Sequence, residues 1–261
     1  MAQKFRSFRV EAIVLKHRDY GEADRLLTIY TRQKGKLQVL AKGVRKVRSQ
    51  KAGHLEPFSL ASLQLAAGRT WHLVSQAEAQ DIFINLTSDL ETLGYASYVA
   101  ELVDRFTFEE EENLPIFNLL KQALTRLNEG SYPAQLVVRY FEVRLLDVLG
   151  FRPELQTCVV SGDEIQPENQ YFSAALGGVV SPQAGKTLSG AVPVSVNALK
   201  YLRHFQRSSF NEAARADPSP PIYHELEILM QYYLTYILER GLNTPAFLRK
   251  VRRDPDAKGQ I

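Results

Sequence analysis

A run of basic side chains in the N-terminal third of this sequence is the part best suited to binding a polyanion. Between Thr31 and Glu56 there is no Asp or Glu, whereas eight Lys and Arg residues occur there: Arg32, Lys34, Lys36, Lys42, Arg45, Lys46, Arg48 and Lys51. Cations without neighbouring carboxylates attract phosphate-rich partners. The run continues into a loop rich in Gly, Ser, Lys and Arg, and flexible cations on a loop can follow a nucleic-acid backbone. The sequence therefore predicts a phosphate-binding surface.

Aromatic residues lie among these cations and offer a second kind of contact. Trp71 follows Arg69 and precedes His72, and an exposed ring in such a setting can stack on a base. We expect Tyr30 and Phe58 to lie in the core instead. The predicted nucleic-acid-binding set is thus the eight cations together with Arg69 and Trp71.

The charge of the chain is divided unevenly along its length. The net charge is +3, but residues 1–80 carry +9 and residues 81–261 carry −6. This asymmetry indicates two parts with different partners. A basic run can also be no more than a solvated face, and the sequence leaves that alternative open.

The elements that must position these residues have a β pattern up to about residue 81. Short apolar or alternating segments, separated by turn residues, occur at 8–16, 25–31, 35–42, 57–66 and 70–81. Five short strands at this spacing predict a small five-stranded barrel, for which the OB-fold is our interpretation and an SH3-like barrel is the alternative.

Helical periodicity replaces the β pattern after Ser88. Apolar residues recur at helical spacing in segments near 93–103, 115–128, 133–149, 196–205 and 222–240. Residues 154–194 are rich in Gly and Pro and predict turns with short strands inserted between helices. We therefore predict an α+β protein, with an OB-fold domain at 1–81 and a mostly helical domain at 82–261. A basic cluster at 249–253 follows the last predicted helix, either as a binding patch or as a solubilising tail.

The remaining sequence features argue against several classes of function. The five histidines show no His-x-x-x-His spacing, and no nucleophile elbow, phosphate-binding loop or dinucleotide fingerprint occurs, so we predict that the protein is not an enzyme. Cys158 is the single cysteine, which rules out an intramolecular disulfide.

No apolar run is long enough to span a bilayer, and Met1–Val10 lacks the apolar core of a signal peptide. We predict a cytoplasmic, nucleoid-associated protein.

Several segments, taken in order, resemble the bacterial recombination mediator family RecO. They include residues 12–15, 20–24, 26–31, 35–37, 40–45 and 55–58, then 149–155, Cys158, Phe172-Ser173 and Gly177-Gly178. The resemblance extends over nearly the whole chain.

This resemblance implies a DNA-binding mediator of recombinational repair that requires no cofactor. Such a protein binds single- and double-stranded DNA, anneals complementary strands, and helps to load RecA onto DNA coated with the single-stranded-DNA-binding protein SSB. The implied partners are RecR and the acidic C-terminal tail of SSB, which the helical domain receives, and indirectly RecA.

One departure from the family concerns metal. Many members carry a four-cysteine zinc site as two Cys-x-x-Cys pairs, but here the first pair reads Cys158-Val159-Val160-Ser161 and the second reads 181–184, Ser-Pro-Gln-Ala. Zinc sites of this type need four ligands. We predict an insertion at 154–194 without metal.

Two other functions fit the β pattern. An RNA-binding OB-fold protein acting in translation or RNA decay would show the same cations, because phosphate contacts are common to DNA and RNA. A pure adaptor whose barrel binds only protein would show no salt-sensitive affinity for nucleic acid.

Overall fold

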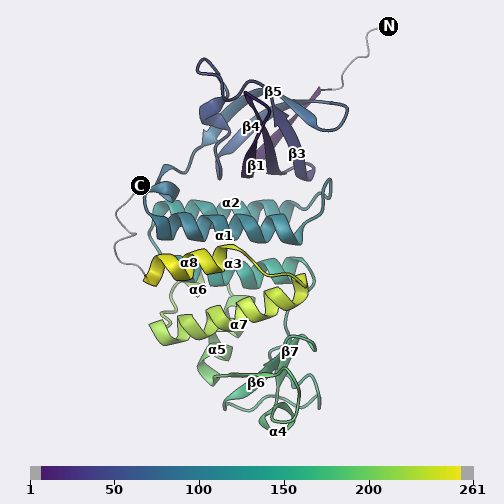
Figure 1. Ribbon diagram of the computed structural model, residues 1–261. Helices are drawn as coiled ribbons and strands as arrows, with labels where there is room; N and C mark the ends of the chain where they lie inside the picture. The colour runs from purple at the N-terminus through teal and green to yellow at the C-terminus, as the bar shows by residue number, and fades with distance from the viewer. Residues whose placement is uncertain (1–6, 254–261) are drawn as a thin grey trace. The chain divides into compact units, whose positions relative to one another are not determined.

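The computed structural model describes residues 7–253 (Figure 1). The outer ends of the two predicted domains, residues 1–6 and 254–261, lie outside this range, as does part of Met1–Val10. The chain forms two compact units, divided after Ser131 and after Asn243. The first unit combines the N-terminal segment with the C-terminal helix, and the second is residues 132–243. Each unit is described separately.

The first unit begins with a closed five-stranded barrel. Its strands are β1 (Ser7–Tyr20), β2 (Asp24–Thr31), β3 (Gly35–Ala41), β4 (Leu60–Ala66) and β5 (His72–Asp81). Their order around the barrel is β1-β2-β3-β5-β4, with β4 returning to β1 and with β3 and β5 parallel. The jump from β3 to β5 gives the Greek-key connectivity of the OB-fold rather than a simple meander. The predicted OB-fold barrel is confirmed.

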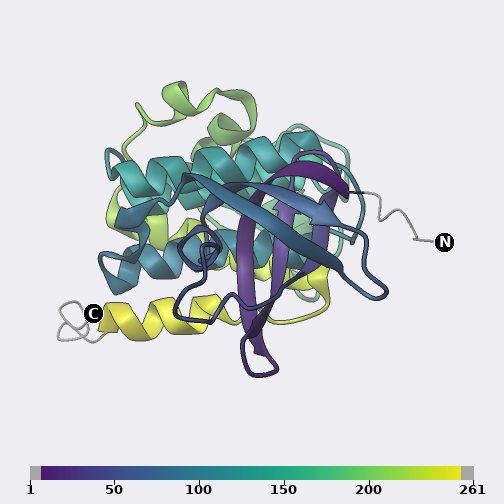
Figure 2. The ribbon, with the colours of Figure 1, turned by 90° about the horizontal axis from the view of Figure 1, so that it is seen from above.

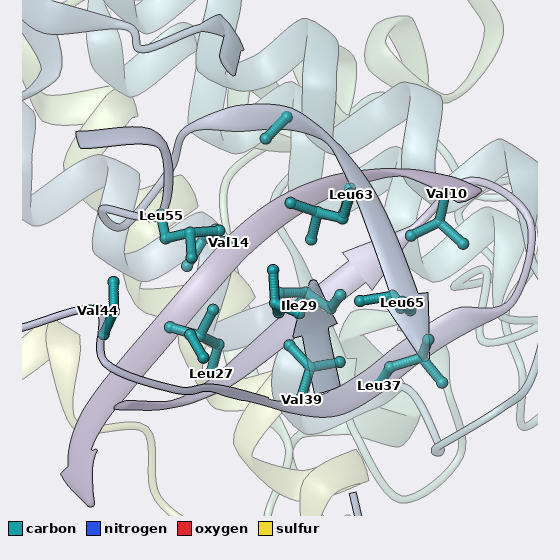
Figure 3. Packing of buried hydrophobic residues seen from close by; sticks show 14 residues of the cluster. Val10, Val14, Leu27, Ile29, Leu37, Val39, Val44, Leu55, Leu63 and Leu65 are labelled. Atoms are coloured by element: carbon teal, nitrogen blue, oxygen red, sulfur yellow. The ribbon is translucent and has the colours of Figure 1, made fainter. Parts of the chain in front are cut away.

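Alternating side chains fill the barrel interior (Figure 3). Leu27 and Ile29 on β2 pair with Val39 and Leu37 on β3, and all four are buried in the same cluster. The alternate residues point outward, as the two-residue period of a strand requires. The strands, coloured purple to blue, curve around this interior in Figure 2.

Two irregular features of the barrel decide where the polar side chains lie. A register shift in β1 between Val14 and Lys16 pairs Lys16 with Thr28 and Arg18 with Leu26. The loop from β3 to β4 contains a short 3-10 helix, η1 (Ala52–His54), and buries Val44 and Leu55 in the barrel core. The basic loop is therefore anchored by apolar residues, while its cations Lys42, Arg45, Lys46 and Arg48 are exposed.

Helices complete the first unit. They are η2 (Ile84–Thr87), α1 (Leu90–Phe106), α2 (Leu114–Glu129) and α8 (Thr244–Arg253). The Asp89 carboxylate caps α1 by accepting from the Glu91 and Thr92 N–H groups, and Asn113 caps α2. Leu248 of α8 packs so closely on Gly94 that a Cβ there would lie 2.5 Å from Leu248 Cδ2. Residues 249–253 therefore belong to a packed helix, and the tail alternative is wrong.

The second unit is helical with a small β insertion. Its helices are α3 (Ala134–Val148), α5 (Val196–Arg207), α6 (Phe210–Ala213) and α7 (Pro220–Leu238). The insertion contains β6 (Gln170–Ser173), β7 (Gly178–Val180), α4 (Pro182–Gly185) and β8 (Val192–Val194), with sheet order β7-β6-β8. The predicted α+β class with a β insertion is confirmed. Within residues 7–253, no helix combines the length and apolar character needed to cross a membrane.

Candidate nucleic-acid interface

Three cations of the β3–β4 loop are available to an external anion. Lys42, Lys46 and Arg48 are exposed, and within the described part of the chain their side chains make no ion pair or hydrogen bond. The loop itself is held in place, because the Gly43 N–H donates to Asp24 Oδ1 at 2.7 Å and the Arg45 N–H donates to the Ala23 carbonyl at 2.9 Å. Available charge on an anchored loop suits phosphate binding.

Three other predicted cations are partly occupied. Arg32 pairs with Glu11 at 3.3 Å, and Arg45 pairs with Asp19 at 3.2 Å. The Lys51 ammonium donates to the Val74 carbonyl at 3.1 Å, and burial lowers the pKa of its amine. Arg45 and Lys51 belong to the β3–β4 loop and Arg32 to the β2–β3 turn, but each has an intramolecular partner that a phosphate would have to share.

Lys36 stabilises the fold and is not available to an external anion. Its half-buried ammonium donates to the Asp104 and Thr107 carbonyls, both at 2.6 Å, at the C-terminal end of α1. A cation there satisfies helix carbonyls and complements the helix dipole. We therefore leave Lys36 out of the proposed binding surface.

Two further cations lie at turns. The Lys34 ammonium is 5.3 Å from the centroid of the Phe8 ring, and the side chain is exposed. Arg69 is exposed in the β4–β5 turn. Both side chains can reach a phosphate without breaking an ion pair.

An aromatic pair joins two turns of the barrel. The Tyr20 and Trp71 rings meet edge to face, with centroids 5.2 Å apart and an interplanar angle of 81°. Tyr20 is 40% exposed and Trp71 is half-buried. The turn carrying Trp71 needs a glycine at position 68, because a Cβ there would lie 2.0 Å from the Trp71 carbonyl oxygen. A base can stack where these rings reach the surface.

A groove lies on the barrel face formed by β1, β2 and β3. It has a volume of about 220 Å³ and is lined by Lys16, His17, Arg18, Leu26, Thr28 and Gln38. OB-folds bind oligonucleotides on the β2–β3 face and on the β1–β2 and β4–β5 loops. The groove, Tyr20 and Trp71 occupy those positions here.

Sequence reasoning missed Lys16, Arg18 and Gln38. Lys16 and Arg18 precede Asp19, Glu22 and Asp24 in the chain, so they do not belong to an acid-free run. The signal that could have found them is strand alternation continued beyond Lys16 to Tyr20, because β1 extends to that residue. Lys16 also pairs with Asp104 of α1.

Acidic groups approach the basic loop in space although they are absent from its sequence. Asp19 lies 3.5 Å from Arg25 as well as 3.2 Å from Arg45, and Glu56 pairs with Arg25 at 2.8 Å. The surface is therefore basic mainly at the outer part of the loop. This explains why only some of the predicted cations remain available.

The insertion does not provide ligands for a zinc site. Cys158 is buried, and its sulfur accepts a hydrogen bond from the Ser181 N–H at 3.2 Å. Burial raises the pKa of this thiol, but hydrogen bonds from Ser161, Ser181 and Val160 outweigh burial and hold the pKa at about 6. Across residues 7–253, no three His, Cys, Asp or Glu side chains are grouped so that they could hold a metal ion. The residues present do not fit the four-ligand zinc site, and the absence of metal stays a prediction.

The barrel connectivity and the groove together define a class: OB-fold proteins with a cationic loop beside an oligonucleotide-type binding face. Residues 5–83 match the family described as "Recombination protein O N terminal", and residues 87–246 match "Recombination protein O C terminal". The chain belongs to the RecO family.

Proteins from several bacteria are similar over nearly their whole length. A protein of Roseiflexus sp. strain RS-1 is 41% identical over 248 residues, covering 95% of this chain and 87% of that protein. One from Dehalococcoides mccartyi strain CBDB1 is 35% identical over 245 residues, covering 94% and 96%. One from Desulforamulus reducens is 32% identical over 252 residues, covering 97% and 98%. Each is named "DNA repair protein RecO".

Proposed function

We propose that this protein is a non-catalytic, DNA-binding mediator of recombinational DNA repair that acts at the nucleoid. It binds single- and double-stranded DNA through the OB-fold barrel and anneals complementary strands. The observation that carries the proposal is the group of available cations Lys42, Lys46 and Arg48 on an anchored loop of the barrel. Membership of the RecO family supports the role in DNA repair.

The proposed binding mode is largely independent of sequence. Cations of the loop neutralise phosphates, and Trp71 stacks on a base at a turn of the same barrel. Phosphate contacts position a strand but carry no base information, whereas stacking accepts any base. Neutralising two strands on one surface lowers their mutual repulsion, and this favours annealing.

The proposed partners follow from family membership. RecR and the acidic tail of SSB are the expected protein partners, and the protein helps to load RecA onto SSB-coated DNA. The helical part of the chain receives the SSB tail in this proposal. A peptide with acidic and apolar residues suits an apolar groove with a basic rim.

Strand annealing tests this function directly. Complementary oligonucleotides coated with SSB should anneal faster in the presence of the full-length protein, and the acceleration should fall as salt rises. Competition with RNA of matched sequence distinguishes the RNA-binding alternative, for which RNA would displace DNA at equal or lower concentration. No acceleration, with no salt-sensitive DNA affinity, would contradict the proposed function.

A further inference from the structure

A second groove lies on a different part of the barrel, on strands β1, β4 and β5. It has a volume of about 330 Å³, and its lining is mostly amide and hydroxyl side chains rather than cations. Arg9, Gln64 and Gln76 are directly paired across these three strands. Neighbouring strands are about 4.8 Å apart, so this row extends across about 10 Å.

The basic loop forms one wall of this second groove. Gln50 and Lys51, in the middle of the β3–β4 loop, line the groove together with the strand residues. The Lys51 ammonium fixes the wall to β5 by donating to the Val74 carbonyl at 3.1 Å. The loop that carries the available cations is thus continuous with the groove.

The groove has a small positive net charge, because two cations and one carboxylate line it. Arg9 and Lys51 are its cations and Glu78 is its carboxylate, and the Lys51 ammonium is already hydrogen-bonded. Glu11, on the next cross-strand row, is held by Arg32 at 3.3 Å and Lys121 at 3.2 Å. A groove of this kind has little attraction for phosphates, but it offers many uncharged hydrogen-bond donors and acceptors.

Unpaired nucleobases have the matching chemistry. A Gln amide both donates and accepts, so it can pair with the edge of any base, and Arg presents a fork that suits guanine. In a duplex the Watson–Crick edges are already occupied. Amides in this groove would therefore distinguish single strands from duplexes, which loop cations bound only to phosphates cannot do.

We propose that the β1–β4–β5 groove is a second nucleic-acid subsite, which binds the edges of unpaired bases on a strand whose phosphates are held by the basic loop. This inference rests on the proposed DNA-binding function. It assigns the discrimination between single-stranded and double-stranded DNA to Gln64, Gln76 and Arg9.

The test uses the full-length protein with Gln64→Ala and Gln76→Ala combined, and a control with Gln156→Ala and Gln183→Ala combined. The control removes two exposed amides from the other unit. Affinity is measured by fluorescence anisotropy for a single strand, the corresponding duplex, and a strand of the same length with abasic sites. Thermal unfolding confirms that each variant is folded.

We expect the wild-type protein and the control to prefer the normal single strand to both other ligands. The Gln64/Gln76 variant should lose roughly tenfold in single-strand affinity and change little toward the duplex or the abasic strand, because two hydrogen bonds to bases are removed. Stacking on Trp71 is present in both proteins and cancels in this comparison.

The outcomes separate this inference from the proposed function. If the folded variant discriminates against the duplex and the abasic strand as strongly as the wild-type protein does, the subsite is wrong while DNA binding stands. The same conclusion follows if the wild-type protein binds all three ligands equally. If the wild-type protein has no salt-sensitive affinity for any of them, the proposed function fails as well.

Discussion

Two lysines separated by one residue at the β2–β3 turn show how local environment divides the cations of this protein. Lys34 is exposed beside the Phe8 ring, whereas the Lys36 ammonium donates to two carbonyls at the end of α1. Both contribute equally to the sequence charge. Only the structure shows that one is available to an anion and that the other stabilises a helix end.

We expect Lys36→Met to lower the free energy of unfolding by about 1–3 kcal/mol, since two carbonyls lose their donor. DNA affinity should change by less than about twofold, because an engaged ammonium contributes little to counterion release. Lys34→Met is the matched control, with the same charge change and a smaller loss of stability, because it removes only the contact with the Phe8 ring. Urea unfolding and anisotropy measure the two effects. A Lys36→Met variant that binds DNA weakly but unfolds normally would return Lys36 to the binding surface.

The Cys158 thiol gives a prediction about pH. Its pKa is lowered from 9.0 to about 6 in the folded protein. Between these values the unfolded chain binds the additional proton, so the free energy of unfolding should rise with pH from about 6 to 9. The contribution is complete above the unfolded pKa and is lost as pH falls through the folded pKa.

Urea unfolding of the wild-type protein and of Cys158→Ser, at several pH values across this window, isolates the effect. The difference in stability between the two proteins should grow in favour of the wild type as pH rises. A difference that stays constant with pH would show that Cys158 is not a stabilised thiolate.

The turns after β1 and β4 act together, because Tyr20 and Trp71 meet edge to face. Trp71 is the single tryptophan of the chain, so its fluorescence reports on this turn alone. Single-stranded DNA should change the emission of Trp71 at low salt. At high salt the DNA should dissociate, and the emission should return to that of the free protein. Trp71→Ala should weaken binding by about 1–3 kcal/mol, the usual contribution of one stacked base.

Tyr236→Ala is the control for Trp71→Ala, since Tyr236 is 51% exposed and lies in the other unit. It should bind DNA as the wild-type protein does. Emission that is unaffected by saturating DNA would show that the Trp71 ring packs only within the protein.

The sequence was enough to predict the five strands of the barrel, but not the contacts that their side chains make. Alternation and turn residues indicate all five strands, since the interior of a small barrel requires a two-residue period. The pairing of Arg45 with Asp19 depends on two segments meeting in space, which no local pattern reveals. The register shift before Lys16 and the packing of α8 on Gly94 are also tertiary features.

The barrel and the first two long helices belong to one compact unit. Tyr30 donates to the Asn113 carbonyl at 3.4 Å, Lys121 pairs with Glu11 at 3.2 Å, and Lys36 contacts the end of α1. A fragment of residues 1–81, the predicted OB-fold domain, would lose these contacts although it keeps the complete barrel core. The boundary at residue 81 stays a prediction.

We expect residues 1–131 to fold with a higher melting temperature than residues 1–81, and to retain the salt-sensitive affinity for single-stranded DNA. Residues 132–243 carry a net charge of −2 and should bind DNA weakly. Circular dichroism and anisotropy on the three fragments test this. Tight DNA binding by a folded 132–243 fragment would place the main site outside the barrel.

The central claim is that the available loop cations bind DNA phosphates, and the salt dependence of binding tests it most directly. Lys42→Gln, Lys46→Gln and Arg48→Gln are combined in one variant, and Lys186→Gln, Lys200→Gln and Arg215→Gln, three exposed cations of the other unit, form the control. In the loop variant, the slope of log affinity for single-stranded DNA against log salt should become smaller in magnitude by about 2, because each of the three lost phosphate contacts contributes about 0.7. Its affinity at low salt should be at least about tenfold weaker. The control should retain the wild-type slope. A folded loop variant with the wild-type slope and affinity would contradict the claim.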